Sequence, residues 1–584
     1  MNLKKKIYLL AVLFAFACGG NEEMQEEKNP EEESAGELTE EVFFEYDLAE
    51  DGAEESTEIN KANKPRIQKP YYMRIHDGNF LSKTGYDKFE HTTAEDLTYS
   101  LDYWEDNDTT KPLLIYAHGG LVGANTAVHK PYKDKFHQLM KNKGIHPFYV
   151  VYGAGIAETT EYIVDDIEGR VKDGFKQIKE DGFFLYVFDK VKRLFQRKSR
   201  NEDFEIDKMN EMEELYFFDV DKTISDIKTG AGEDEIDWDS PELDFTEQEI
   251  EEFTAELFED PNFQKELDKG RVMDEYEIKG LNQIEKMDIA VVGKVIALYQ
   301  IVKGIVSRFR KNRDHGLWCT FFEEFVDHSK LKIFGMINLQ KWLNKYIEAI
   351  WRETKDNVAR GFATEESAGT KLAYELVNRK GEVTLSGSST GAIFVCELIK
   401  KMDEIKLNNP DAYKDLTVKV IMVVPACRFT LFESTFRNTQ IVRQENIMVM
   451  NLTDKKEKDG INFVLYPRST LYLVSGIAEG EDTFNDMPIL GMERFFIEKG
   501  RQQELTDDEE RAIGFAYDYL KYGQEDSRII HSCFPQNGED CPVYTHNGVM
   551  HVGVINDKLG MNTIANFTLH GYDNPNEDRL RTGN

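Results

Sequence analysis

Short apolar runs recur along the chain and are separated by stretches with helical periodicity. Apolar runs of roughly four to eight residues that end in turn signals are typical of strands buried on both faces of a sheet. Their alternation with helices predicts an α/β fold with a doubly wound, mostly parallel sheet. The predicted strands lie at residues 71–75, 97–104, 113–117, 147–152, 383–385, 418–424, 447–450 and 543–544.

Residues 158–365 depart from this alternation. They carry many charges and few turn signals, and residues 167–179, 247–267 and 290–310 have the periodicity of amphipathic helices. We therefore predict a large helical insertion, or cap, between the fourth and fifth strands. Its most apolar part, residues 291–306, fits either a core-facing helix or a surface that meets acyl chains or a membrane.

The N-terminal residues have the pattern of an export signal. Lysines at positions 4–6 precede an apolar segment at 7–16, and small residues mark a cleavage site at 15–17. Residues 1–17 resemble a bacterial lipoprotein signal peptide, in which Cys18 becomes the lipidated N-terminus. This resemblance implies a lipid anchor in the bacterial cell envelope, at the outer membrane; the alternative is a secretory peptide that leaves Cys18 free. The acidic stretch that follows Cys18 resembles the surface-export signals of some bacterial lipoproteins.

Residues 18–64 are rich in glutamate and poor in apolar side chains, so they are predicted to be a disordered, solvated tether. The whole chain of 584 residues is acidic, with 108 Asp and Glu against 72 Lys and Arg and a net charge of −36. Such a charge repels nucleic acids and anionic lipid surfaces, so we expect no nucleic-acid partner.

The cysteines divide into two groups. Cys533 and Cys541 bracket a short loop, which in an exported protein predicts a disulfide; two separate thiols are the alternative. Cys396 and Cys427 lie in apolar segments and are expected in the core. No Cys/His spacing indicates a zinc site, and no metal is predicted.

One pentapeptide indicates chemistry. Residues 387–391 read Gly-Ser-Ser-Thr-Gly directly after a predicted strand and before a predicted helix. Gly-x-Ser-x-Gly between a strand and a helix is the nucleophile elbow of serine hydrolases, which exposes the serine hydroxyl on a tight turn. Ser389 is therefore the predicted nucleophile.

A second glycine-rich segment follows the strand at 113–117. His118, Gly119, Gly120 and Leu121 resemble the His-Gly-Gly oxyanion loop of esterases and lipases. Preorganised amides in such a loop stabilise the charge that develops on the carbonyl oxygen. The predicted donors are the amide of Gly120 or Leu121, with Gly119 allowing close approach, and the amide of Thr390.

The acid and the base are expected late in the chain. Asp454 follows the strand at 447–450 and is the first choice for the acid that orients the histidine, with Asp459 second and Glu457 third. His551 lies beyond the last predicted strand and is the favoured base, with His546 as its competitor.

The chain order of oxyanion loop, serine, acid and histidine resembles that of α/β-hydrolases. Residues 551–564, 469–475, 490–494 and 313–317 resemble segments of a poorly described bacterial group in that superfamily, although Ser388 stands where the group usually has histidine. The resemblance implies a core of residues 65–157 and 366–584, with the insertion at 158–365.

The same resemblance implies a carboxylic ester hydrolase that needs no cofactor. Its substrate would be a small-molecule or lipid ester, cleaved through a Ser389-His551-Asp454 triad and an acyl-enzyme. An amidase or peptidase with the same triad stays open, because these reactions share the machinery. The alternative from another class is a non-catalytic surface lipoprotein that uses the fold to bind a partner or a glycan.

Overall fold

The computed structural model describes seventeen segments of the chain, and every statement about structure refers to them. They are residues 70–80, 92–108, 111–120, 127, 135–152, 183–199, 245–246, 249–250, 253, 302–306, 319–321, 323, 351–459, 468–479, 486–497, 505–531 and 557–572.

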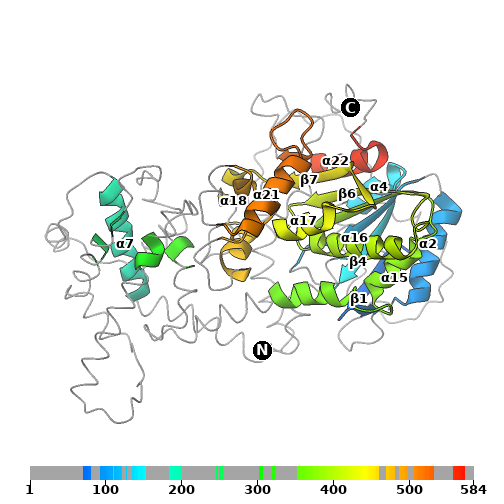
Figure 1. Cartoon of the computed structure of the whole chain (residues 1–584), viewed down its shortest axis with the longest axis horizontal. Helices are drawn as coiled ribbons and strands as arrows, with labels where there is room; N and C mark the ends of the chain where they lie inside the picture. The colour runs from blue at the N-terminus through cyan, green and yellow to red at the C-terminus, as the bar shows by residue number, and fades with distance from the viewer. Residues whose placement is uncertain are drawn as a thin grey trace, which may run out of the picture.

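An eight-stranded sheet organises this part of the chain, in the order β2-β1-β4-β3-β5-β6-β7-β8 (Figure 1). Neighbouring strands are parallel except for β2, which pairs antiparallel with β1. The protein is therefore of the α/β class with a mostly parallel sheet, as the sequence predicts. The strands are β1 (Tyr72–His76), β2 (Asn79–Phe80), β3 (Leu113–Ala117), β4 (His146–Tyr152), β5 (Gly381–Ser388), β6 (Leu416–Val423), β7 (Val442–Asn451) and β8 (Ile529–His531).

The central strands are buried because their side chains are apolar on both faces of the sheet. Every residue of β3 and β4 is buried, as are the last six residues of β5 and of β6. Pairing registers align their carboxyl ends, with Ser388 opposite Val423 and Val423 opposite Met450. The residues that follow β5, β6 and β7 therefore meet at one edge of the sheet.

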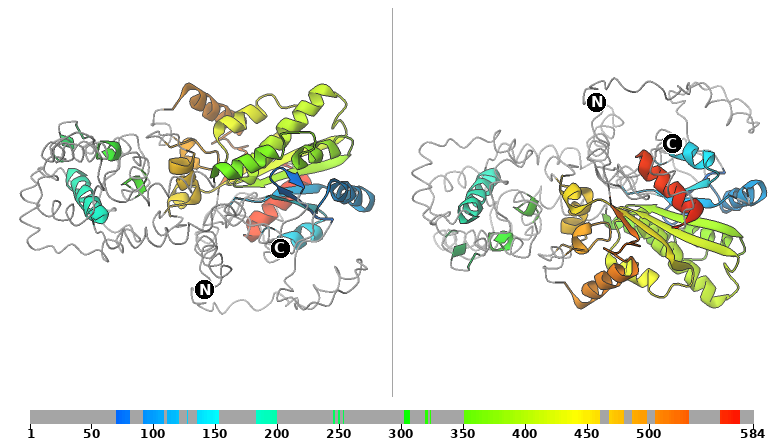
Figure 2. Two further views of the ribbon diagram at one scale, coloured as in Figure 1. Left: turned by 90° about the horizontal axis from the view of Figure 1, so that it is seen from below. Right: turned by 90° about the horizontal axis from the view of Figure 1, so that it is seen from above.

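Helices cover both faces of the sheet (Figure 2). On one face lie α4 (Phe136–Asn142) and α22 (Lys558–His570), and the Lys419 ammonium on β6 donates to the Thr568 carbonyl of α22 at 2.9 Å. The opposite face carries α15 (Ala368–Glu375), α16 (Gly391–Asn408), α17 (Phe429–Phe436) and α21 (Asp507–Tyr519). The remaining described helices include α18 (Asp454–Asp459), α19 (Thr470–Leu473), the π-helix η4 (Val474–Ala478) and the 3₁₀ turn η5 (Glu493–Phe495).

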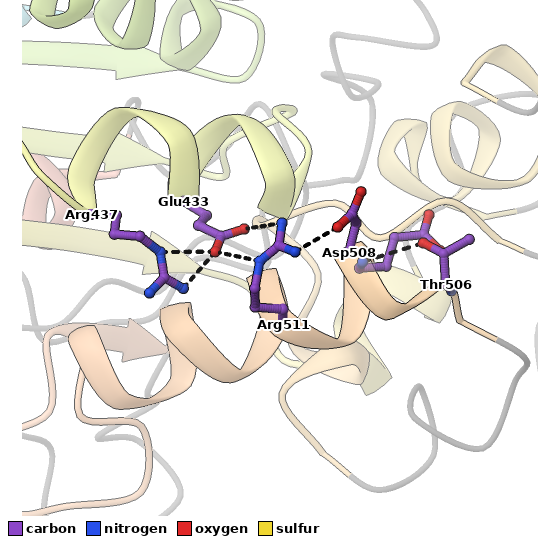
Figure 3. A network of polar contacts seen from close by, with 6 residues as sticks. Glu433, Arg437, Thr506, Asp508 and Arg511 are labelled. Carbon is purple, nitrogen blue, oxygen red and sulfur yellow. Dashed lines mark hydrogen bonds and ion pairs between the residues drawn. The ribbon is translucent and has the colours of Figure 1, made fainter.

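A polar network joins α17 to α21 (Figure 3). Glu433 of α17 accepts from the Nε of Arg511 on α21 at 3.0 Å. Thr506 begins α21 with a capping box that it forms with Glu509. Glu509 also pairs with Arg428, the residue before α17, at 3.2 Å. Charged contacts therefore hold α17 to α21 at two places, at the start of α17 and in the second turn of α17.

The strand predicted at residues 97–104 is wrong, because this segment lies in the helix α2 (Ala94–Asp108). Leu97, Leu101 and Trp104 are all buried, and their spacing of four and three residues places them on one helical face. That face packs toward β1 and α15, so the apolar residues that suggested a strand are the core stripe of an amphipathic helix.

The last strand of the sheet was not anticipated. β8 contains only three residues and pairs with β7 through Val449 and Ile529, whereas the predicted strand at 543–544 lies outside the described residues. A run this short carries no periodicity, so the sequence offers too little signal to identify it.

Between β4 and β5, all the described residues that have regular secondary structure are helical. They include α7 (Phe183–Ser199), residues 302–306 and residues 351–360. The predicted helix at 167–179 lies outside the described residues, and a separate helical cap stays a prediction. None of the described helices combines the length and the apolar character that crossing a bilayer requires.

Two of the cysteine predictions can be compared with the structure. Cys396 and Cys427 are both buried and reduced, which confirms their place in the core. A hydrogen bond with Cys396, together with burial, raises the pKa of the Cys427 thiol, so this thiol stays protonated and unreactive. Cys18, Cys533 and Cys541 lie outside the described residues.

Candidate active site

Ser389 occupies a strained turn between β5 and α16. Its φ of +52° lies in the left-handed region, which costs a non-glycine residue about 1–3 kcal/mol and is concentrated at functional sites. A Cβ on Gly387 would lie 2.4 Å from the Gly391 oxygen, and a Cβ on Gly391 would lie 2.2 Å from the Ala117 oxygen. Only glycine fits at both positions, and the turn leaves Ser389 partly exposed while its two neighbours are buried.

The loop after β6 holds the serine from the other side. The Ser389 amide donates to the Val423 carbonyl at 2.8 Å, and the Ser389 carbonyl accepts from the Ala426 amide at 3.0 Å. Val424, between them, has a φ of +42°, which is unusual for a β-branched residue. Two strained residues from adjacent strand ends therefore meet at this site, held by main-chain hydrogen bonds.

The glycine-rich loop after β3 lies directly against the turn. A Cβ on Gly119 would lie 3.2 Å from the Ser389 Cβ, and a Cβ on Gly120 would lie 2.9 Å from the Thr390 Cγ2. The structure thus brings together Gly119, Gly120, Ser389 and Thr390, four residues that the sequence assigns to the site. Leu121, the other predicted donor, lies outside the described residues.

His118 supports this loop and is unsuited to be a base. Its Nδ1 lies 2.7 Å from the Gly119 carbonyl, and its Nε2 lies 3.2 Å from both the amide and the carbonyl of Tyr152. The ring also stacks on Tyr152 at 4.5 Å between centroids. Burial lowers the pKa of His118 to about 4, so it stays neutral near pH 7.

Tyr152, at the end of β4, connects the loop with the helix that follows the serine. Its hydroxyl donates to the His118 carbonyl at 2.6 Å and lies 3.0 Å from the Thr390 Oγ1. Among the described residues, no backbone carbonyl accepts from the Thr390 amide, which lies at the N-terminal end of α16. This amide can therefore serve a developing oxyanion.

Asp454 is the first residue of α18, shortly after β7 ends, and is buried. Its Oδ1 accepts from the Tyr472 hydroxyl at 2.5 Å, and its Oδ2 pairs with the Lys458 ammonium at 2.8 Å. Its amide donates to Glu493 at 2.7 Å. A carboxylate offers about four lone-pair sites, so two partners leave capacity for an imidazole.

The other two acid candidates lie on the same short helix. Glu457 is fully buried, and burial together with the nearby Asp454 carboxylate raises its pKa to about 8. A carboxyl that is neutral at pH 7 cannot stabilise an imidazolium. Asp459 ends α18, and a helical rotation of about 100° per residue turns it well away from the direction of Asp454.

His531 and Glu493 are near the acid and were missed at the sequence level. His531 ends β8, and its Nε2 lies 3.6 Å from Glu493 Oε1, while Glu493 Oε2 accepts from the Asp454 amide. Burial lowers the pKa of His531. Three strand spacings, roughly 14 Å, separate β8 from β5, so His531 is too distant to be the base for Ser389. In the sequence, the only sign of His531 as a residue at a strand end is that it follows two isoleucines.

The predicted bases His551 and His546 lie outside the described residues. Within the described part of the chain, no three His, Cys, Asp or Glu side chains gather in a way that could hold a metal ion. Comparisons with protein-family models, with curated proteins and with solved structures found no match to this chain. The functional interpretation therefore depends on the geometry around Ser389.

Proposed function

We propose that this chain is a serine hydrolase of the α/β-hydrolase fold that cleaves carboxylic esters. The observation that carries the proposal is the left-handed backbone of Ser389 at the end of a central parallel strand, with the loop after β3 packed against it. In that superfamily, the nucleophile occupies such a strained turn, and the oxyanion hole uses the next amide together with one from the loop after the third strand.

The proposed reaction begins with attack of the Ser389 Oγ on the ester carbonyl carbon. The base takes the hydroxyl proton, and the carbonyl oxygen becomes an oxyanion that accepts from the Thr390 amide and from an amide of the loop at 119–121. Collapse breaks the carbon–oxygen bond to the alcohol, which leaves with the proton from the base. Water then cleaves the acyl-enzyme by the same steps. We assign the base to His551, with His546 as the alternative.

Asp454 is the acid that the geometry supports. Its strand end lies two strand spacings, about 10 Å, from that of Ser389. Two hydrogen bonds of about 2.8 Å and the ring between them span roughly 8 Å, so one imidazole can connect the two residues. Asp454 accepts from the Tyr472 hydroxyl and pairs with Lys458, whereas burial raises the pKa of Glu457 and holds that carboxyl neutral.

The test is labelling with a fluorophosphonate probe, followed by mass spectrometry of the labelled peptide. Wild type should carry the label on Ser389 and hydrolyse p-nitrophenyl butyrate, and Ser389→Ala should lose both properties. Ser527→Ala, which changes a serine on the loop before β8, should keep both. An unlabelled, folded wild-type protein would contradict the proposal and leave the non-catalytic surface protein as the better interpretation.

Two further measurements refine the assignment. A p-nitroanilide with the same acyl group separates esterase from amidase activity, because only the leaving group differs. His551→Gln and His546→Gln should differ in the rate of labelling, since loss of the base slows phosphonylation of the serine. Equal labelling rates in wild type and both variants would remove the proposed base.

The proposal for the cellular location is a lipid anchor on Cys18 in the bacterial cell envelope. Its support is the sequence pattern alone. Metabolic labelling with an alkyne fatty acid should mark the wild-type protein and leave Cys18→Ser unmarked.

A further inference from the structure

A groove of about 450 Å³ has a lining that mixes charged, hydroxyl and apolar side chains. One wall is the helical segment 351–360 and another is the start of α17, with one residue of α16 and the end of η4 between them. Its lining includes three cations, Arg352, Lys355 and Arg428, and a single carboxylate, Glu479.

This charge is unusual for the chain. Acidic residues outnumber basic ones by 108 to 72 overall, yet cations outnumber carboxylates in the groove by three to one. A chain with a large net negative charge repels anions on average, so a cationic groove is a place where an anion can bind selectively.

The carboxylate in the groove is already neutralised. Glu479 is buried, accepts from the Trp351 indole at 2.8 Å, and pairs with Lys355 at 2.9 Å. Its two oxygens therefore serve structural contacts that fix the wall, and Arg352 and Arg428 are the cations of the lining that Glu479 does not pair.

Arg428 has capacity for a ligand. One of its terminal nitrogens pairs with Glu509 at 3.2 Å, and 34% of its side chain stays accessible. Arg352 is exposed on the segment that faces α17 across the groove. A planar guanidinium matches the geometry of a carboxylate or a phosphate, and two of them can bind one anionic group.

Two segments of the chain that line the groove, the start of α16 and the start of α17, also continue to the residues around the nucleophile. Ile393, which lines it, lies in the first turn of α16, a helix that begins two residues after Ser389. Arg428 comes two residues after Ala426, whose amide donates to the Ser389 carbonyl. An acyl chain of a few carbons attached to Ser389 could therefore reach the groove.

We propose that this groove binds an anionic group, a carboxylate or a phosphate, that is carried by the ester which Ser389 cleaves. This inference rests on the proposed function for its catalytic part, whereas binding of the anion itself does not require turnover. The substrate class would then be acidic esters, such as monoesters of short dicarboxylic acids.

The kinetic test compares two substrates of equal length. p-Nitrophenyl valerate ends in a methyl group where p-nitrophenyl hydrogen glutarate carries a carboxylate, and the spontaneous rate of each is subtracted. We expect kcat/KM to favour the glutarate ester by roughly tenfold, the usual effect of one charged hydrogen bond. Arg352→Gln and Arg428→Gln should each reduce this preference, and added salt should weaken it.

The control removes the same charge elsewhere. Arg443 is exposed on β7, 82% accessible in its side chain, and Arg443→Gln should leave the preference unchanged. A wild-type enzyme without preference, or an equal loss in Arg443→Gln and Arg352→Gln, would overturn the inference. Arg352 is the safer variant, since Arg428 also contacts the cap of α21.

Calorimetric titration of Ser389→Ala with glutarate and with inorganic phosphate separates this inference from the proposed function. Binding that Arg352→Gln weakens supports the groove even if no ester is cleaved, and the tighter of the two anions identifies the preferred group. Absence of binding by both anions would refute the groove as an anion site, while fluorophosphonate labelling still reports on Ser389.

Discussion

The buried carboxyl of Glu457 should make the stability of the protein depend on pH in an unusual way. This carboxyl is completely buried, and burial raises its pKa from 4.5 to about 8. Between these two values the folded state holds a proton that the unfolded state releases, so the contribution to stability is full below pH 4.5 and is lost as pH rises through 8. The interval of 3.5 pH units corresponds to about 5 kcal/mol at 1.36 kcal/mol per unit.

The perturbation is Glu457→Gln, which keeps the shape of the side chain and removes the titration. Denaturant unfolding at pH 5, 6, 7 and 8 should show the variant gaining on wild type by up to about 1.4 kcal/mol per pH unit. The matched control is Glu365→Gln, an exposed glutamate, whose difference from wild type should stay flat. A Glu457→Gln difference that is equally flat would refute the burial argument.

Further predictions concern strain, close packing and a buried ion pair. Ser389→Gly should raise the free energy of unfolding by about 1 kcal/mol, because glycine tolerates the positive φ, whereas Ser389→Ala should not. Gly391→Ala should cost about 3 kcal/mol through a clash with a main-chain oxygen and abolish probe labelling, while Gly514→Ala, whose new Cβ meets no atom within 4 Å, should be neutral or stabilising. Arg494→Met should cost roughly 3–5 kcal/mol because it removes the buried ion pair between Arg494 and Asp486. Arg494→Met combined with Asp486→Asn should recover part of that loss, and denaturant unfolding measures each.

Local patterns in the sequence were sufficient for the central strands and for the turn at Ser389. The runs at 113–117, 147–152, 383–385 and 447–450 lie in strands, and the run at 418–424 does so up to Val423, where β6 ends. An apolar run bounded by turn signals is typical of a buried strand in an α/β protein. The glycines at 387 and 391 predicted the tight turn for the same local reason, and the structure shows the positive φ of Ser389 there.

Other features depended on contacts between distant residues. The segment at 97–104 reads as a strand in the sequence, but it forms part of α2 because its apolar side chains pack against β1 and α15. Those contacts come from other parts of the chain, so the segment alone does not reveal them. The neutral state of Glu457, the contact of His531 with Glu493 and the cationic groove have no local signature at all.

The sequence by itself determined which segments form the parallel sheet and which serine stands at the end of its central strand, since backbone preference and apolar periodicity act over a few residues. Tertiary structure decided which loop touches that serine, which carboxyl is kept neutral by burial and where positive charge gathers. Burial and electrostatic interaction depend on distances in space, and only the packed fold sets those distances.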